Sequence, residues 1–447
     1  MNSLPVWAPI LNALMMLFKN MDTVVLLLSG GASSRYWPLP HKMLMSYLGI
    51  SFIDHQIRLL QQMGLTNIIV VGRPEINHAL GKTHVTKILQ KGSGQAAAVL
   101  SAQKLISDKS VLILNATDVI NVKLIKKVLG KAVKNRNLLV GRKVSQYFPG
   151  GYFELDRTRV VAIHEKPGEG NEPSQYTRLV CDYFANGFLL INAIKNVTTE
   201  KDDLYETAVT RLIKSGEIFE MIEYQDEWVP VKYPWDTLSL MQHYLLQIGR
   251  SRAAKTVKIH RTAQISGKVF LGQNVRVLEY AKLVGPLWVG DNTIIGNHTM
   301  VRASHIGANC VIGFNSDVTR SYLGDNVWLH SNYIGDSVVA SGVSFGSGTV
   351  LANLRLDEQN VYSWVNDERV STHLDKLGAM IGENTHIGVN VSVMPGIKIG
   401  KNSVVGAGAV VDRNLPDSTA CFVKQTLDVK TNNRQVGPDR NKFKQKI

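Results

Sequence analysis

The sequence predicts two different folds in one chain, an α/β domain followed by an all-β parallel β-helix. The first half alternates apolar runs of strand length with segments of helical spacing, and the second half repeats aliphatic residues at every sixth position. The composition, 45% hydrophobic and 19% charged, is that of a folded protein and excludes disorder as the dominant state. A chain of 447 residues has room for two such domains.

Strands and helices alternate along the first third of the chain. We expect strands at 24–28, 67–72 and 111–114, separated by helices at 51–63 and 94–105. This order is typical of a parallel sheet that is covered by helices. The first two strands end in glycine-rich turns, and open α/β sheets bind ligands at the carboxyl ends of their strands.

The second half has an internal repeat. Aliphatic residues recur every six positions from Ile259 to Val301 and again from Ile381 to Val411, with shifts of phase between 306 and 334. A period of six is that of a short strand and a tight turn, and three such units close one coil around inward aliphatic side chains. Residues 353–376 lose the period and become charged, so we expect a loop that leaves the helix there.

Domain boundaries follow from these patterns. We expect a dispensable extension at 1–20, the α/β domain at 21–248, a linker at 249–258, the β-helix at 259–423 and a basic tail at 424–447. The apolar stretch near the start is shorter than the roughly 20 residues that a membrane span needs, and it lacks the basic start of a signal peptide. We therefore expect a soluble protein without a membrane partner.

Cysteine count and charge exclude other classes of protein. Three widely spaced cysteines argue against a disulfide scaffold or a cysteine-rich zinc site, so we expect a cytoplasmic protein. The net charge of +14 is compatible with a nucleic-acid partner, but the excess of basic residues is spread diffusely along the chain outside the tail. No platform of aromatic and basic residues accompanies it, and we expect no nucleic acid as partner.

The first predicted strand runs into a loop suited to phosphates. Gly30, Gly31 and the three small residues after them are followed by Arg35, two prolines and Lys42. Small residues let backbone N–H groups approach an anion, while arginine supplies a planar multidentate donor and lysine a compact charge. A plain tight turn is the alternative for the two glycines alone.

Together with five later segments in the same order, this loop resembles the motifs of the sugar-1-phosphate nucleotidyltransferases. The segments are 92–96, 114–118, 148–152, 165–167 and 233–236. The resemblance implies a Rossmann-like mixed sheet. It also implies the following site: Gly30, Gly31, Gly94 and Gln95 on the nucleotide, Gly151, Glu165 and Lys166 on the sugar phosphate, Arg35 and Lys42 as catalytic cations, and Asp118 and Asp236 as ligands of Mg²⁺.

These residue types suit nucleotidyl transfer. A sugar phosphate oxygen attacks the α-phosphorus of a triphosphate and pyrophosphate leaves, so positioning and charge neutralisation dominate catalysis. Mg²⁺ prefers hard oxygen ligands such as carboxylates. Two departures from the family pattern stand out: His41 precedes Lys42 where proline is usual, and Ser33-Ser34 replaces a glycine–threonine pair.

The β-helix carries a second candidate site. Residues 327–336, with Asn353, resemble the acyltransferase half of the bifunctional N-acetylglucosamine-1-phosphate uridylyltransferases, which implies a left-handed β-helix that uses acetyl-CoA. His330 matches the general base, Tyr333 and Asn353 match sugar contacts, and Arg302 matches a phosphate-binding arginine. The unperturbed histidine pKa of about 6.5 suits a general base. An exposed corner histidine without a role is the alternative.

The sequence thus predicts a cytoplasmic transferase that makes a UDP- or dTDP-sugar and carries a second, acyltransferase activity. The resemblance implies a homotrimer, for which Trp288 and Trp328, both off the inward register, are candidate contacts. We expect a chain cut near Gly249 to be monomeric and active. A purely structural β-helix and a catalytically inactive regulatory or assembly homologue are the alternatives, and the base and sugar stay open.

Overall fold

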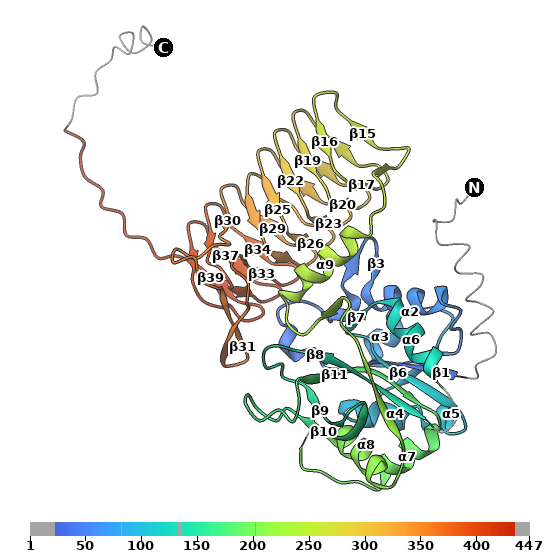
Figure 1. Cartoon of the computed structure of the whole chain (residues 1–447). Helices are drawn as coiled ribbons and strands as arrows, with labels where there is room; N and C mark the ends of the chain where they lie inside the picture. Colours follow the sequence, from blue (N-terminus) through green and yellow to red (C-terminus); the bar gives the residue numbers. More distant parts are fainter. Residues whose placement is uncertain (1–22, 82, 133–135, 202, 434–447) are drawn as a thin grey trace.

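The computed structural model describes residues 23–81, 83–132, 136–201 and 203–433, which form an α/β domain and a long prism of short strands (Figure 1). The predicted extension at 1–20 and most of the basic tail lie outside the described residues. No helix within the described ranges is both long and apolar enough to cross a membrane.

The α/β domain is built on a nine-stranded sheet in the order β5-β4-β1-β6-β11-β8-β12-β10-β9. Four neighbours are parallel: β5 (Thr86–Leu89), β4 (Ile68–Gly72), β1 (Thr23–Ser29) and β6 (Ser110–Asn115). The rest of the sheet is formed by β11 (Tyr176–Phe184), β8 (Asn137–Lys143), β12 (Phe219–Glu223), β10 (Arg159–Glu165) and β9 (Gly151–Asp156). Because β11 runs antiparallel to both β6 and β8, the predicted mixed sheet is confirmed.

Helices cover both faces of this sheet. One face carries α2 (Phe52–Gln62), α3 (Pro74–Ala79), α6 (Val122–Lys131) and α9 (Asp236–Leu246); the other carries α4 (Gly94–Ser101), α5 (Gln103–Ile106), α7 (Gly187–Lys195) and α8 (Leu204–Lys214). Alternate residues of β1 accordingly enter two different apolar clusters, with Val25 and Leu27 in one and Val24 and Leu26 in the other. The helix expected at 94–105 is divided in two at Ala102.

The prism is a parallel β-helix with three faces, as predicted. One face contains β14 (Arg252–Ala253), β17 (Val269–Leu271), β20 (Leu287–Val289), β23 (His305–Ile306), β26 (Tyr322–Leu323), β28 (Val338–Val339), β33 (Met380–Ile381) and β36 (Lys398–Ile399). The second contains β15 (Lys258–Ile259), β18 (Arg276–Val277), β21 (Ile294–Ile295), β24 (Val311–Ile312), β29 (Ser344–Phe345), β34 (His386–Ile387), β37 (Val404–Val405) and β39 (Ala420–Cys421). The third contains β16 (Gln264–Ser266), β19 (Lys282–Val284), β22 (Met300–Arg302), β25 (Asp317–Thr319), β27 (Tyr333–Gly335), β30 (Val350–Leu351), β35 (Ser392–Val393) and β38 (Val410–Val411).

The six-residue period places the aliphatic side chains inside the prism. From Leu271 onward the aliphatics of the repeat are buried, whereas Ile259 and Ile265 are 45% and 38% exposed. These two belong to the first coil, which has a neighbouring coil on one side only. That coil already includes β14, so the β-helix begins inside the segment expected to be a linker.

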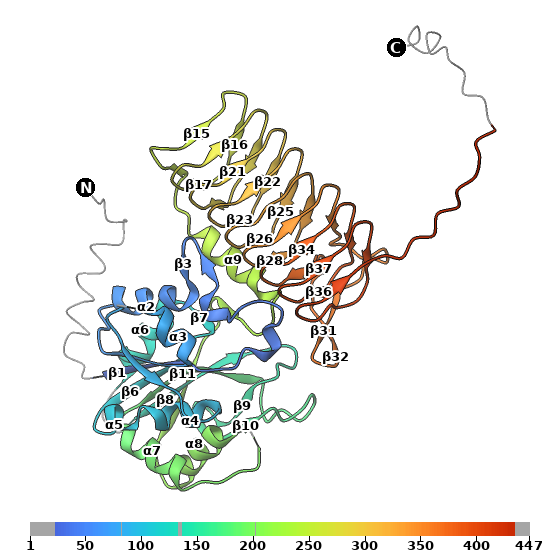
Figure 2. The ribbon, with the colours of Figure 1, turned by 180° about the vertical axis from the view of Figure 1, so that it is seen from behind.

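The charged segment 353–376 leaves the prism and contains a hairpin, β31 (Tyr362–Val365) and β32 (Glu368–Ser371). Here the sequence predicted only a loop. The hairpin lies at the end of the prism that is next to the α/β domain (Figure 2).

The two domains share one apolar core. Tyr47 of the α/β domain packs against Tyr322 and His305 of the prism, with ring centroids 5.5 and 6.4 Å apart. The Tyr322 hydroxyl donates to the Ser46 carbonyl (3.0 Å), and the Trp37 indole N–H donates to Asp417 (2.8 Å). This packing disagrees with the expectation that a cut near Gly249 leaves an independent first domain.

Candidate active site

Residues 30–42 form a loop at the carboxyl end of β1, on the edge where the sequence predicted a site. Ser33 has a φ of 53°, and a short 3-10 helix, η1 (Ser34–Tyr36), follows it. At Gly30 a Cβ atom would lie 1.7 Å from Oε1 of Gln90, so a larger residue here would displace the Gln90 side chain. At Gly31 a Cβ atom would meet nothing within 4 Å, which leaves space beside the backbone for a ligand.

His41, one of the two departures from the family pattern, braces this loop. Its ring Nε2–H donates to the Gly31 carbonyl (3.0 Å), and Nδ1 accepts the backbone N–H of Met43 (3.3 Å). Burial lowers the pKa of His41, so the neutral tautomer that makes both bonds is favoured. The histidine therefore fixes the conformation of the residues between the glycines and Lys42.

Strand pairing brings Asp118 and Asp236 to one place. β7 (Asp118–Ile120) pairs antiparallel with β13 (Trp228–Pro230), with Pro230 opposite Asp118. The chain then enters α9, whose first residue is Asp236. Oδ2 of Asp236 accepts the backbone N–H groups of Lys232 and Tyr233, each at 2.7 Å, which fixes the carboxylate at the start of the helix.

Three cations surround the two carboxylates. Lys42 Nζ donates to the Val231 carbonyl (2.7 Å), and the Arg35 guanidinium is exposed and forms no hydrogen bond or ion pair with the described residues. Burial lowers the pKa of Lys42 and, to about 8, that of Lys232, while Asp118 and Asp236 oppose both shifts and Arg35 adds to them. Five charged groups thus act on one another electrostatically, with one positive charge in excess, which suits a polyanionic ligand.

The carboxylates fit the chemistry of a Mg²⁺ site. Burial raises the pKa of Asp118 and raises that of Asp236 to about 6. The hydrogen bonds that each carboxylate accepts lower its pKa and only partly offset this effect. The bond from Asn115 to Asp118 (3.0 Å) and both bonds to Asp236 end on Oδ2, which leaves Oδ1 of each residue for a cation. No group of three or more acidic, histidine or cysteine side chains that could hold a metal occurs within the described ranges, so phosphate and water oxygens would have to complete the shell.

The expected sugar side lies across from these groups. Gly151 begins β9 opposite Glu165 at the end of β10, and the Lys166 ammonium lies 3.3 Å from Oε1 of Glu165. A cavity of about 430 Å³ opens beside Lys166, Arg35 and Tyr233. This volume is within the range of small-ligand pockets.

The expected nucleotide segment begins α4. Gly92 and Gly94 have positive φ angles of 84° and 81°, and the Gln90 amide donates to both of their carbonyls (3.2 Å each). Oε1 of Gln95 accepts a bond from the buried Arg178 (3.4 Å). Gln90 therefore links this segment to Gly30, and Arg178 orients Gln95.

In the β-helix, two of the predicted acyltransferase residues converge. A Cβ atom at Gly335 would lie 2.6 Å from Nδ2 of Asn353 and 2.8 Å from the Tyr333 hydroxyl. His330 is exposed at the corner before β27, and its imidazole forms no hydrogen bond or ion pair within the described part of the chain. Arg302 lies two coils away and forms an ion pair with Asp317 (3.2 Å).

Sequence reasoning missed several residues around these sites. Lys232 directly precedes a segment that was recognised, but its proximity to Asp118 depends on the β7–β13 pairing. Arg178 forms buried ion pairs with Asp182 and Glu206, and no sequence motif indicates these pairs. Arg320 forms a bidentate pair with Asp336 (2.6 and 2.7 Å) next to Asn353.

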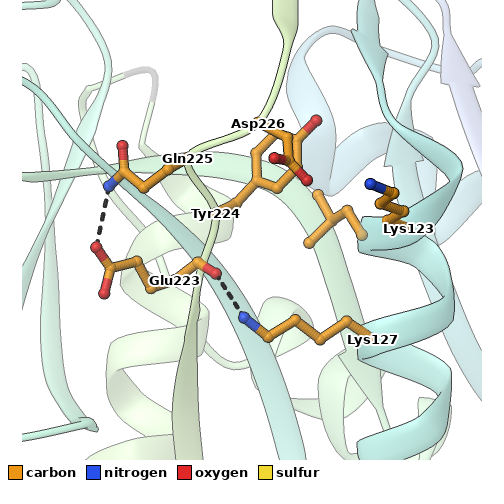
Figure 3. A pocket seen from close by; sticks show the side chains of 7 residues that line it. Lys123, Lys127, Glu223, Tyr224, Gln225 and Asp226 are labelled. Carbon is orange, nitrogen blue, oxygen red and sulfur yellow. Dashed lines mark hydrogen bonds between the residues drawn. The ribbon is translucent and has the colours of Figure 1, made fainter.

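A separate cavity of about 330 Å³ lies between α6 and the end of β12 (Figure 3). Its lining includes Lys127, which donates to the Glu223 carbonyl (3.0 Å), and Gln225, which donates to the Glu223 carboxylate (3.0 Å). None of the predicted site residues lines it, and we assign it no role.

Comparison with known proteins gives matches in both halves. Residues 25–261 match the family model described as the MobA-like NTP transferase domain, and residues 378–413 match six bacterial transferase hexapeptide repeats. A bifunctional sugar-1-phosphate nucleotidylyltransferase/acetyltransferase of Sulfurisphaera tokodaii is 28% identical over 87% of this chain and 97% of its own. The bifunctional protein GlmU of Methanococcus vannielii is 28% identical over 92% of this chain and all of its own. A putative uncharacterized acetyltransferase of Escherichia coli, YaiX, is 35% identical over 35% of this chain and 69% of its own.

Proposed function

From the premise that this chain belongs to the family of MobA-like NTP transferase domains, we propose that it makes a nucleoside-diphosphate sugar from a nucleoside triphosphate and a sugar 1-phosphate. The observation that carries the proposal is the convergence of Asp118 and Asp236 with Arg35, Lys42 and Lys232 at the carboxyl edge of the sheet. The product is of the UDP- or dTDP-sugar class, by the resemblance of residues 92–96.

The chain's own residues position the reactants. Backbone groups at Gly30 and Gly31 hold the triphosphate, and Arg35 neutralises the charge that develops on the departing pyrophosphate. Lys42 and Lys232 approach the α-phosphate from the side of the two carboxylates. Mg²⁺ held by those carboxylates supplies further neutralisation of the phosphate charge.

The sugar 1-phosphate enters from the opposite side. Lys166 binds its phosphate, and Glu165 accepts a hydrogen bond from a hydroxyl of the sugar. The attacking phosphate oxygen is already ionised at neutral pH, so no general base is needed in this step.

A screen of pyrophosphate release tests the proposal. Four nucleoside triphosphates are each combined with a panel of sugar 1-phosphates in the presence of Mg²⁺. We expect release only when both substrates are present, with UTP or dTTP preferred. Release that does not depend on the sugar phosphate would contradict the transfer.

A second activity is favoured by His330. Its free imidazole, near the converging Tyr333 and Asn353, suits a general base that takes a proton from the amine of an amino sugar attacking acetyl-CoA. The matched variants His330→Asn and His298→Asn separate this role from that of a corner histidine, since both residues are exposed and precede strands of the same face, two coils apart. Only the first should abolish coenzyme A release; equal activity of both variants would contradict it.

We also propose that the β-helix assembles as a homotrimer. Exposed aromatic rings support this, because Tyr280 stacks on His298 and His298 meets Phe314 along one corner of the prism. Trp328 is 52% exposed and is available for a contact. Trp288 is not, because it stacks on Phe270 (3.7 Å) and packs against the α/β domain. Light scattering measures the mass, and a monomer would refute the proposal.

A further inference from the structure

The hairpin of β31 and β32 forms one wall of the cavity at the candidate active site. Its tip, defined as Asn366, Asp367 and Glu368, faces Arg35 and Lys166 across the cavity of about 430 Å³. Figure 2 shows the hairpin extending from the end of the prism toward the α/β domain. The C-terminal domain therefore contributes residues to a site built by the N-terminal domain.

The hairpin is held firmly on both of its sides. Val361, at its base, and Val365 are buried in the apolar cluster that also contains residues of β1. The Ser363 hydroxyl donates to the Gly396 carbonyl (2.7 Å), and the Lys398 ammonium donates to the Trp364 carbonyl (2.6 Å). β31 and β32 pair along their whole length at four residue pairs, and a two-residue turn connects them. The tip is thus preorganised rather than free to adapt.

The two walls of the cavity differ in charge. The α/β wall carries Arg35 and Lys166, whereas the tip carries two carboxylates and an amide. Neither Asp367 nor Glu368 forms an ion pair within the part of the chain that is described. A ligand that is anionic at one end and rich in hydroxyl groups at the other matches this arrangement, because hydroxyls donate strong hydrogen bonds to carboxylates.

We propose that the hairpin tip binds the sugar ring of the sugar 1-phosphate, so that the β-helix domain selects the sugar on which the α/β domain acts. This inference rests on the proposed function. The phosphate lies toward Lys166, and the ring hydroxyls lie toward Asp367 and Glu368. The negative tip also repels the phosphate and so disfavours the reversed orientation.

The test uses the full chain with the variants Asp367→Asn and Glu368→Gln. Each keeps the shape of the side chain and removes its charge. The control is Glu358→Gln, an exposed carboxylate in the same charged segment that does not line the cavity. The KM for the sugar 1-phosphate, the KM for the triphosphate and kcat are measured over the panel of sugars.

We expect at least one tip variant to raise the KM for the preferred sugar 1-phosphate by about tenfold or more, since a hydrogen bond to a charged group is lost. The KM for the triphosphate should stay within about twofold of wild type, and the order of preference among sugars should change. The Glu358 control should match wild type.

Unchanged sugar kinetics in both tip variants would overturn the inference while leaving the proposed function intact. A rise in kcat/KM for every sugar would also overturn it, because the tip would then be an inhibitory contact. Failure of the proposed function has a different signature: the wild-type protein would turn over no sugar 1-phosphate at all.

Discussion

Lys398 is a buried cation at the junction of the two domains, and its replacement by methionine has a calculable effect. The side chain is 1% exposed, donates to the Trp364 carbonyl and lies 5.6 to 5.9 Å from the rings of Trp37 and Trp235. Burial lowers the pKa of Lys398 from 10.5 to about 8. At 1.36 kcal/mol per pH unit, this corresponds to at most roughly 3 kcal/mol.

The sign follows from proton linkage. The unfolded chain keeps the Lys398 proton up to a pH near 10.5, whereas the folded protein releases it near 8. Between these values the unfolded state binds more protons, so the contribution of Lys398 to stability rises with pH. Below pH 8 both states are charged, and the cost of burying the charge is constant.

The assay is urea unfolding of wild type and Lys398→Met at several pH values from 7 to 10.5. Other titrating groups are common to both proteins and cancel in the difference. At pH 7 the variant loses the bond to Trp364 but also the buried charge, so the two stabilities should be similar. The difference in the free energy of unfolding, wild type minus variant, should then grow with pH by up to roughly 3 kcal/mol. A difference that is independent of pH would refute the reasoning.

Further predictions concern the site and the domain junction. Lys232→Met should lower kcat/KM of nucleotidyl transfer by about a hundredfold while the urea midpoint changes little, because a charge-assisted bond to phosphate is lost; a wild-type rate would remove Lys232 from the site. A chain ending at Gly249 should be insoluble or aggregate in light scattering, since it exposes Tyr47 and its neighbours, and a stable active monomer would contradict the shared core. Lys42→Met should reduce both activity and the urea midpoint, because the bond that holds the Val231 carbonyl disappears as well; loss of activity alone would show that the bond does not support the fold.

Periodic patterns made much of the fold predictable. Strands β1, β4 and β6 and the coils of the prism follow from local patterns of apolar residues, which are visible in the sequence itself. β5 was missed because Thr86–Leu89 contains only two apolar residues and is half-exposed. The segment 362–371 carries a two-residue turn between short alternating strands, a signal that could have revealed the hairpin.

Contacts between distant segments were not predictable in the same way. Lys232 joins the two aspartates only because β13 pairs with β7, and short strands of three residues leave no periodic signal. The packing of Trp288 against the α/β domain likewise depends on how the two domains meet. For the same reason the sequence suggested separable domains. The residues that pack at the domain junction are tyrosines and aliphatic residues, which do not stand out from other core residues of each half.

The central claim is that Asp118 and Asp236, brought together by the pairing of two short strands, form the site of metal-dependent nucleotidyl transfer. The most direct measurement compares pyrophosphate release by wild type, Asp236→Asn and the exposed control Asp226→Asn, in Mg²⁺ with the preferred substrates from the screen. We expect Asp236→Asn to be at least about a hundredfold slower at an unchanged or raised urea midpoint, since a buried carboxylate is replaced by a neutral amide. Asp226→Asn should match wild type. Wild-type rates in Asp236→Asn, or undiminished release in excess chelator, would contradict the account.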